Sequence, residues 1–462
     1  MNQTITTLAF LAITVGLGAS VWQWRRAEAA HAEAERRFED VRRLAGSLLF
    51  ELHDAIEVLP GSTAARALIV NRGVEYLDRL AASSVDPALR AELAAGYLRL
   101  GDVQGRRGEA SLGDATAAIE SYRKAVRLAD ALAAPAGANV EQSALLARAC
   151  ARLAEALRES GETKEADALL GRAVNLLEAA VAQEPASTSL RSRLAARRFD
   201  QGRAHADAGD WPAALEAYGR SAELYEALVV AAPGNPQHRR NVALTHKYMG
   251  GASTMMGRHD ESRRHYDAAV TIDRELLRSS PQDPTAHMDL SYDVAALAKA
   301  DQSAGLLGPA VAGLREALAL RQWVLSADPV NVQARAGVAR AHTDLAWMLG
   351  QSGAWAEAEA EMRRGVAERE RLAAQTKGTP GPPLEFAKAM GLLAELLVAP
   401  ERPASADREA EACALYRRSE RVFAGVRDRL PQKDQGWLET LTLRARCRAH
   451  GPNETPRSPI EK

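Results

Sequence analysis

The sequence has 462 residues, with 59 lysines and arginines against 60 aspartates and glutamates, and a formal net charge of -1. This balance excludes a strongly basic nucleic-acid-binding protein as a description of the whole chain. Aromatic residues make up only 5%, whereas alanine and leucine recur throughout. Such a composition favours closely packed helices over sheets. It therefore predicts an all-α protein.

The first predicted element is a single membrane-spanning helix at residues 5–24. No charged residue occurs from 5 to 22, and this length is close to the roughly 20 apolar residues that a spanning helix needs. Trp22 and Trp24, which two arginines follow, are typical of an anchor at the membrane–water interface. A cleaved secretory signal is the alternative. Such a signal begins with a basic segment, which the first four residues lack.

Residues 25–86 are predicted to form a helical hairpin. In its first helix, apolar residues recur at alternating steps of three and four. A Pro-Gly pair interrupts this pattern, and a second helix is expected to about Ala82, with Ser62 or Thr63 as its cap. The alternative is a coiled-coil stalk that continues the membrane helix and forms a homodimer.

The following part of the sequence repeats itself every 48 residues. Glycines show this step (161 − 113 = 48) at Gly113, Gly161, Gly209, Gly257, Gly305 and Gly353. Prolines keep it at Pro185, Pro233, Pro281 and Pro329. Small residues keep it at Ala154, Gly202, Gly250, Ala298, Ala346 and Ala394, and large ones at Tyr122, Leu170, Tyr218, Tyr266, Leu314 and Met362. Parallel series with one period indicate a repeat architecture.

Each series has a physical role in a pair of antiparallel helices. The small residue allows the first helix to approach its partner closely. The glycine ends that helix in a left-handed conformation that other residues rarely adopt. The large residue lies on the side of the second helix that packs back on the first, and the proline ends the second helix. Stacked pairs would bury one continuous core.

At these positions the sequence resembles the tetratricopeptide repeat (TPR) family. The segment QGRAHADAGDWPAALEAYGRSAELYEALVVAAP matches the family's spacing of small, glycine, alanine, tyrosine and proline residues. The resemblance covers residues 87–430 and implies a TPR-like α-solenoid of about seven helix pairs. The repeat is longer than the usual ~34 residues of the family. Residues 431–462 are predicted to form a C-terminal helix and a disordered tail.

The resemblance implies that the first helices line a groove that holds a protein or peptide segment. The basic residues expected to face this groove are Arg148, Arg158, Arg203, Lys247, Lys299, Arg340 and Lys388. The acidic residues at equivalent places are Glu155, Glu159, Asp207 and Glu395. The excess of basic residues predicts an acidic partner segment. The alternative is that these side chains only solvate the helix faces.

No motif of an enzyme or of a cofactor site is found, so neither catalysis nor a cofactor is predicted. His259 and His265, in a histidine-rich stretch, are six residues apart and face different sides of a helix. No metal site is therefore expected there. The three cysteines, Cys150, Cys413 and Cys447, are far apart and predict neither a zinc site nor a disulfide framework.

Residues 36–105, beginning RRFEDVRRLAGSLLFELHDAIEVLPGSTAARALIVNRGVEYLDRLA, resemble a second family. They are similar to the region after the membrane helix in bacterial receptor-type serine/threonine protein kinases that carry C-terminal TPR arrays. The kinase signatures themselves are missing from this sequence. The resemblance therefore implies a stand-alone sensor half, a split gene or a mis-started reading frame.

This second resemblance implies a single-pass protein of the bacterial cytoplasmic membrane with extracytoplasmic repeats. The basic residues after the membrane helix indicate the opposite, cytoplasmic side. Two functions agree with the sequence. The first is a membrane-anchored, non-catalytic scaffold that binds a protein or peptide and no nucleic acid. The second is the sensory or regulatory moiety of a serine/threonine kinase signalling system.

Overall fold

The computed structural model describes residues 22, 24–26, 28, 33, 63–83, 86–105, 111–134, 139–376, 378–430 and 434. Every regular element in these ranges is helical, which confirms the all-α prediction. Within the same ranges, no helix has both the length and the apolar character needed to cross a membrane. The predicted membrane helix, apart from Trp22 and Trp24, lies outside the described residues. So do most of the first hairpin helix and nearly all of residues 431–462.

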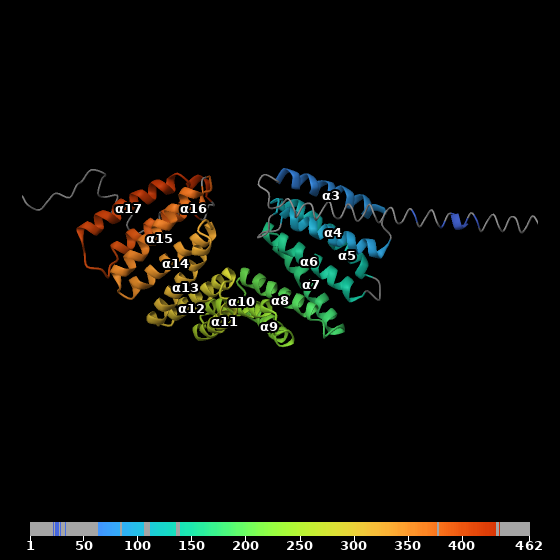
Figure 1. Cartoon of the computed structure of the whole chain (residues 1–462), viewed down its shortest axis with the longest axis horizontal. Coiled ribbons are helices and arrows are strands. Elements are labelled where there is room, and N and C mark those ends of the chain that lie inside the picture. The colour runs from blue at the N-terminus through green and yellow to red at the C-terminus, as the bar shows by residue number, and fades with distance from the viewer. Residues whose placement is uncertain are drawn as a thin grey trace, which may run out of the picture. The chain divides into compact units, whose positions relative to one another are not determined.

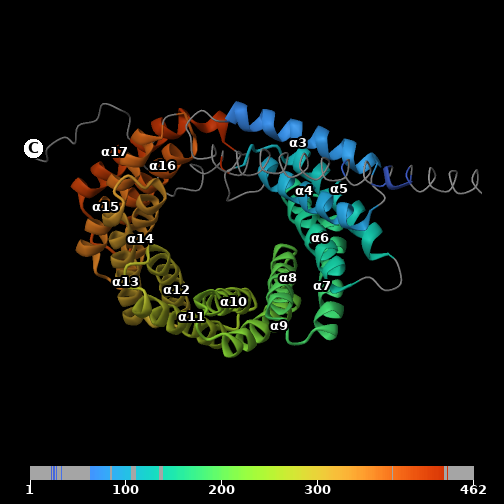
Figure 2. The ribbon, with the colours of Figure 1, turned by 45° about the vertical axis from the view of Figure 1, so that its right-hand side comes forward.

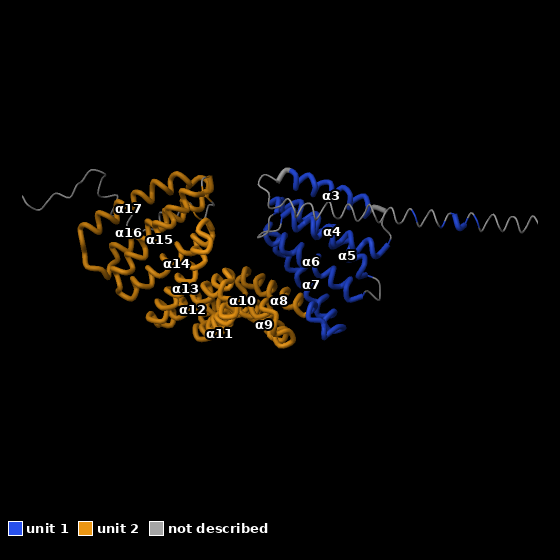
Figure 3. The backbone as a smooth tube through the Cα atoms, in the orientation of Figure 1, with its two compact units in different colours: residues 1–190 blue, residues 191–462 orange. Residues whose placement is uncertain are grey.

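The chain divides into two compact units, residues 1–190 and residues 191–462 (Figure 3). The boundary falls within helix α8, Thr188–Asp207, whereas the sequence predicts one array over residues 87–430. Within each unit, consecutive helices pack in pairs and the pairs stack on one another. The TPR-like solenoid predicted from the repeats therefore describes the local architecture of both units.

The helices described over their whole length in unit 1 start with α3, which coincides with the second helix of the predicted hairpin and packs against α4. They are α3 (Thr63–Ser83), α4 (Pro87–Gly105), α5 (Ala115–Ala133), α6 (Val140–Ser160) and α7 (Thr163–Gln183) (Figure 1). The pairs are α4 with α5 and α6 with α7, and α5 joins them by packing against α6.

Unit 2 continues the same plan with longer runs of paired helices. After α8 they are α9 (Trp211–Ala231), α10 (Pro236–Met255), α11 (His259–Ser279), α12 (Pro284–Ser303), α13 (Leu307–Ala327), α14 (Val332–Gln351), α15 (Trp355–Gln375), α16 (Gly381–Leu397) and α17 (Ala406–Ala424), followed by the 3-10 turn η2 (Arg427–Arg429). The first helices of the pairs, α10, α12 and α14, lie on one side of this unit, and the second helices α11, α13 and α15 on the other (Figure 2).

The turn between paired helices is made by glycine, as predicted. Every glycine of the 48-residue series has a positive φ, between 72° and 92°. At the end of α6, Gly161 N–H donates to Arg158 O at 3.1 Å and Glu162 N–H donates to Leu157 O at 2.8 Å. These two bonds satisfy carbonyl groups that the helix end leaves free. The left-handed conformation is what makes this closure possible.

Proline and a capping side chain mark the passage from one pair to the next. The second helices α7, α9, α11 and α13 end two residues before Pro185, Pro233, Pro281 and Pro329. The first helix of the next pair is then capped by an amide or carboxylate: Asn235 accepts from Gln237 N–H, and Asp283 from Thr285 N–H. The predicted stop by proline is confirmed, and the cap follows it directly.

In each helix pair, the small residue of the first helix and the large residue of the second helix fit each other in size. Where the small residue is glycine the large one is tyrosine, so Gly202 contacts Tyr218 and Gly250 contacts Tyr266. A Cβ atom at Gly250 would lie 2.9 Å from Tyr266 Cε1, and one at Gly202 would overlap the Tyr218 ring. In the next two pairs the small and large residues are Ala298 with Leu314 and Ala346 with Met362, all buried in one apolar cluster.

The cysteines differ in oxidation state. Cys150 on α6 is a buried free thiol, whereas Cys413 on α17 is disulfide-bonded. The expectation of no disulfide is therefore wrong for Cys413, because folding brings together cysteines that are distant in sequence. The bonded partner is not among the described residues.

Candidate functional site

The candidate site is the exposed side of the first helices of unit 2, which we call the first-helix face. Large apolar side chains are exposed there: Tyr248 (38%) and Met255 (60%) on α10, Tyr292 (42%) on α12 and Trp347 (48%) on α14. Residues that are one or two periods of 48 apart occupy equivalent positions in successive repeats. Tyr292 is therefore equivalent to residue 244 (292 − 48), and Trp347 to residue 251 (347 − 96). Positions 244, 248, 251 and 255 lie on one side of a helix. These side chains therefore share one stripe.

Sequence reasoning missed this stripe because it compared only the charged residues of the first helices. The signal is present in the sequence, but it becomes visible only when three successive repeats are superimposed and read with helical periodicity. No single helix carries more than two of the residues. Contiguous exposed apolar groups of this kind are typical of interaction surfaces.

Five of the seven basic residues predicted for the groove have register positions on the same stripe. Arg148, Arg340 and Lys388 are equivalent to residue 244, and Arg203 and Lys299 to residue 251. Arg148 belongs to unit 1 and the other four to unit 2. All are exposed except Lys388, which is half-buried. Binding of an acidic segment by these residues stays a prediction.

Two of these cations in unit 2 have acidic neighbours. Lys299 Nζ lies 4.0 Å from Asp344 Oδ2. Lys388 Nζ lies 3.3 Å from Glu385 Oε1 and 3.6 Å from Asp434 Oδ1. Arg203 and Arg340, in contrast, form no ion pair with any residue that the structure describes. They are thus the two exposed cations among the predicted groove residues of unit 2 for which the described residues supply no ion pair.

The remaining two predicted residues are each paired with a carboxylate. Arg158 Nη2 lies 2.5 Å from Asp167 Oδ1 on α7, at the turn between paired helices. Lys247 Nζ lies 2.9 Å from Asp293 Oδ1 on α12, a residue that is only 1% exposed. Lys247 is thus held by a buried carboxylate within the helix packing.

Lys247 belongs to a buried polar layer between α10, α11 and α12. Asp273 on α11 is 2% exposed and adjoins Asp293, and Arg240 Nε lies 2.9 Å from Asp289 Oδ2. Burial, with the neighbouring Asp293 carboxyl as the next cause, raises the pKa of Asp273 to about 8. A neutral Asp273 can therefore donate a hydrogen bond to Asp293, which leaves Lys247 paired with a single negative charge.

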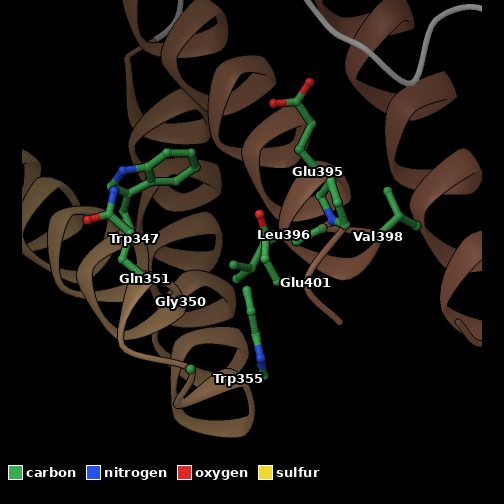
Figure 4. A pocket seen from close by; sticks show the side chains of 11 residues that line it. Trp347, Gly350, Gln351, Trp355, Glu395, Leu396, Val398 and Glu401 are labelled. Carbon is green, nitrogen blue, oxygen red and sulfur yellow. The ribbon is translucent and has the colours of Figure 1, made fainter. Parts of the chain in front are cut away.

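One end of the first-helix face adjoins a pocket of 890 Å³. It is lined by Trp347, Gly350, Gln351, Gly353, Trp355, Glu395, Leu396, Val398, Ala399, Pro400 and Glu401. In Figure 4, Trp347 lies on one side, Glu395 and Val398 lie on the other, and Trp355 closes the lower end.

The pocket has aromatic walls and acidic side chains. Trp355 is held by Arg402, whose guanidinium carbon lies 5.6 Å from the ring centre, and Arg402 Nη2 is 2.9 Å from Glu359 Oε2. Glu395 and Glu401 contribute carboxylates, and the described lining includes no lysine or arginine. Such a pocket suits an apolar or cationic side chain rather than an anionic one.

The histidine-rich stretch forms one contact that sequence reasoning missed. His246 on α10 and His265 on α11 have their Nδ1 atoms 3.2 Å apart, and their Nε2 atoms face Glu226 and Glu261 at 3.8 and 4.0 Å. Burial lowers the pKa of both imidazoles. In the described part of the chain, no group of three or more potential ligands is placed to hold a metal ion. The contact is a hydrogen bond between two neutral rings across a helix pair.

The comparison with protein families agrees with the repeat geometry. The family model of the tetratricopeptide repeat matches residues 110–131, which include most of α5. The chain contains a tetratricopeptide repeat. TPR helix pairs build extended surfaces suited to protein–protein interaction, and the proteins built from them are generally non-catalytic scaffolds.

Several solved structures are similar to this chain. BtubC from P. vanneervenii is 20% identical, with a TM-score of 0.44, over 56% of this chain and 91% of its own. A signal transduction ATPase with numerous domains and a TPR sensor, from Pyrococcus horikoshii, is 14% identical, with a TM-score of 0.46, over 84% and 52%. The apo form of RapI is 10% identical, with a TM-score of 0.49, over 88% and 98%. No curated protein matches the sequence.

Proposed function

We propose that this chain is a non-catalytic TPR scaffold that binds a protein or peptide segment on the first-helix face of unit 2. The observation that carries the proposal is the stripe of Tyr248, Tyr292 and Trp347, residues that are 38%, 42% and 48% exposed. Exposed aromatic side chains on rigid helices lose little entropy on binding and often dominate binding energy.

The charges on the face support a segment that carries acidic groups. Arg203 and Arg340 are exposed on the stripe, and Lys299 is close to a single carboxylate at 4.0 Å. Lys247 takes no part, because Asp293 holds it inside the packing. Complementary charge on the partner would orient the segment along the face.

Site-specific photo-crosslinking in the native host tests this proposal. A photoreactive residue at Trp347 or Tyr248 is expected to capture a discrete partner. The matched control is Val330, an apolar residue that is 84% exposed but lies outside the stripe, in the loop after α13. Equal products from all three positions would contradict the proposal. Substituting Arg203, Lys299 and Arg340 by glutamate should lower the captured amount if the partner segment is acidic.

The proposal includes a membrane anchor at residues 5–24, supported by the uncharged stretch and the two tryptophans that follow it. Alkaline extraction of membranes should leave the full chain in the pellet and release a variant that lacks residues 1–26. Release of both proteins would exclude an anchor. A reporter fused at Lys462, active on one side of the membrane only, determines on which side the repeats lie.

A second candidate is the sensory or regulatory moiety of a serine/threonine kinase system, supported by the resemblance of residues 36–105. Its test is the intact mass of the native protein together with co-purification of kinase activity. Absence of both would leave only the scaffold. A kinase recovered with the chain would support the regulatory function.

A further inference from the structure

Arg321 on α13 is a buried cation without an anionic partner. Its side chain is only 3% exposed. The guanidinium donates from Nε to Ser291 Oγ and from Nη1 to the Gly337 carbonyl oxygen, both at 3.2 Å. These bonds use two of its five N–H donors. Within the described residues, no carboxylate forms an ion pair with it.

Three other arginines of unit 2, with side chains at most 15% exposed, are paired with carboxylates. Arg402 Nη2 lies 2.9 Å from Glu359 Oε2, and Arg335 Nη1 lies 2.8 Å from Glu368 Oε2. Arg369, which has the register of Arg321 in the following repeat (321 + 48), lies 3.0 Å from Glu385 Oε2. Removing a guanidinium from water is unfavourable unless a carboxylate compensates. Arg321 differs from these three because hydrogen bonds to neutral groups and the Tyr292 ring are its contacts among the described residues.

The position of Arg321 connects it with the first-helix face. Its guanidinium carbon lies 5.2 Å from the ring centre of Tyr292, and that ring is 42% exposed. Arg340 on α14 occupies the register of Tyr292 in the next repeat (292 + 48) and is exposed. Burial lowers the pKa of Arg321, and the charge of Arg340 contributes in the same direction, whereas Asp344 opposes it. Arg321 Nη1 also donates to the carbonyl oxygen of Gly337, three residues before Arg340 on α14, so the two arginines lie beside the same part of the stripe.

We propose that Arg321 and Arg340 form a seat for one carboxylate of the partner segment, with Tyr292 packing against that segment. This inference rests on the proposed binding function and specifies the chemistry of its ligand. A carboxylate at this place would receive the N–H donors that Arg321 does not use. Two guanidinium groups, that of Arg321 buried and that of Arg340 exposed, would then neutralise it.

A monoanion suits this seat better than a dianion. Lys299 and Asp344 lie at its edge, 4.0 Å apart, and nearly cancel each other. The net positive charge of the seat therefore comes from Arg321 and Arg340. The carboxylate can belong to a glutamate or aspartate side chain or to a chain terminus, and the two sources are distinguished by the test.

The experiment measures fluorescence anisotropy of labelled peptides with the full chain in detergent. The probes are an eight-residue peptide with two glutamates and an amidated C-terminus, its glutamine counterpart, and the glutamine peptide with a free C-terminus. The seat predicts that the glutamate peptide or the free terminus binds at least tenfold more tightly than the neutral peptide. Equal binding of all three would overturn the proposal.

The variants are Arg321→Met, Arg340→Ala and the control Arg315→Met. Arg315 is also on α13 but pairs with Glu357 at 2.6 Å and has a side chain that is 52% exposed. The first two variants should each lower carboxylate binding at least tenfold, and the control should leave it unchanged. Wild-type binding by Arg321→Met, or an equal loss in the control, would refute the seat.

Folding of Arg321→Met is checked by its helical circular dichroism and melting temperature, which should equal or exceed those of the wild type because an unpaired buried charge is removed. If this variant does not fold, Arg321→Lys and Arg340→Ala decide, since lysine keeps the charge but loses the planar fork. If the wild type shows no preference for the carboxylate peptides but still crosslinks a partner at Trp347, the seat is overturned and the proposed partner function stands. Loss of crosslinking with intact carboxylate binding would overturn the proposed partner function alone.

Discussion

The two halves of unit 2 share a backbone plan but differ in how their helices pack. From α8 to α11, glycine on the first helix faces tyrosine on the second, as in Gly202 and Tyr218. Charged side chains such as Lys247 and Asp273 are withdrawn from solvent there. From α12 to α15, alanine replaces this glycine and leucine or methionine replaces the tyrosine, and these residues lie in one apolar cluster that also includes Tyr416 of α17.

This difference shows what the repeat period determines and what it does not. Residues 225, 273 and 321 occupy one register position, yet they are Tyr225, Asp273 and Arg321, and all are buried. The period therefore determines where a side chain lies. The chemistry there depends on the neighbouring first helix, which supplies Asp293 opposite Asp273 but no carboxylate opposite Arg321.

The largest effect is expected from breaking the ion pair between Lys247 on α10 and Asp293 on α12, where the two halves meet. Lys247→Met leaves Asp293, which is 1% exposed, without its cation at 2.9 Å. Removing one partner of a buried pair typically lowers the free energy of unfolding by about 3–5 kcal/mol. Urea unfolding followed by circular dichroism measures this change.

The matched control is the double variant Lys247→Met with Asp293→Leu. It removes both charges and should recover most of the stability that the single variant loses. A loss below about 1 kcal/mol in the single variant would show that Lys247 is not held by the packing. It would then be available to a partner, as the sequence predicts.

The second effect concerns the matched sizes of glycine and tyrosine. In Gly202→Ala the added methyl group would overlap the Tyr218 ring, and overpacking of this kind usually lowers the free energy of unfolding by about 1–3 kcal/mol. The double variant Gly202→Ala with Tyr218→Leu copies the second half and should be more stable than the single variant. Additive losses in the double-mutant cycle would contradict the size matching.

The third effect is a pH dependence that arises where Asp273 on α11 is buried beside Asp293. The pKa of Asp273 is raised from 3.8 to about 8, so between these values the folded chain binds a proton that the unfolded chain releases. The contribution of Asp273 to the free energy of unfolding is therefore fully present below about pH 4 and is lost as the pH rises through about 8. The slope is at most about 1.4 kcal/mol per pH unit.

Asp273→Asn keeps the hydrogen-bond donor but cannot ionise. Its free energy of unfolding should fall less steeply than that of the wild type between pH 5 and pH 8. Measurement of urea midpoints across this range checks the sign. A slope that the substitution leaves unchanged would show that another group titrates.

The sequence predicts the backbone of the repeats well and their polar interior poorly. The turn at Gly161 and the stops before the prolines follow from conformational rules that a single residue type satisfies. The inward position of Lys247 could not be predicted, because it depends on Asp293 of the next repeat. Arg321 is not predicted for a related reason: it lies on a second helix, whereas the family resemblance points to the first helices as the binding surface.

The smallest expected effect concerns the ion pair that links the two halves across their second helices. Arg274 Nη2 on α11 lies 2.8 Å from Glu316 Oε2 on α13, with side chains that are 48% and 38% exposed. Arg274→Gln should lower the free energy of unfolding by only about 0.2–1 kcal/mol, and the difference should vanish near 1 M salt because exposed charges are screened. The control is Arg220→Gln, which also removes a positive charge. Its ion pair with Glu216 lies within α9 and therefore connects no two helices. If Arg274→Gln is clearly more destabilising than this control at low salt, the junction between the polar and apolar halves depends on the pair. If the two variants are equal, the packing of α11 against α12 and of α12 against α13 is sufficient to join the halves.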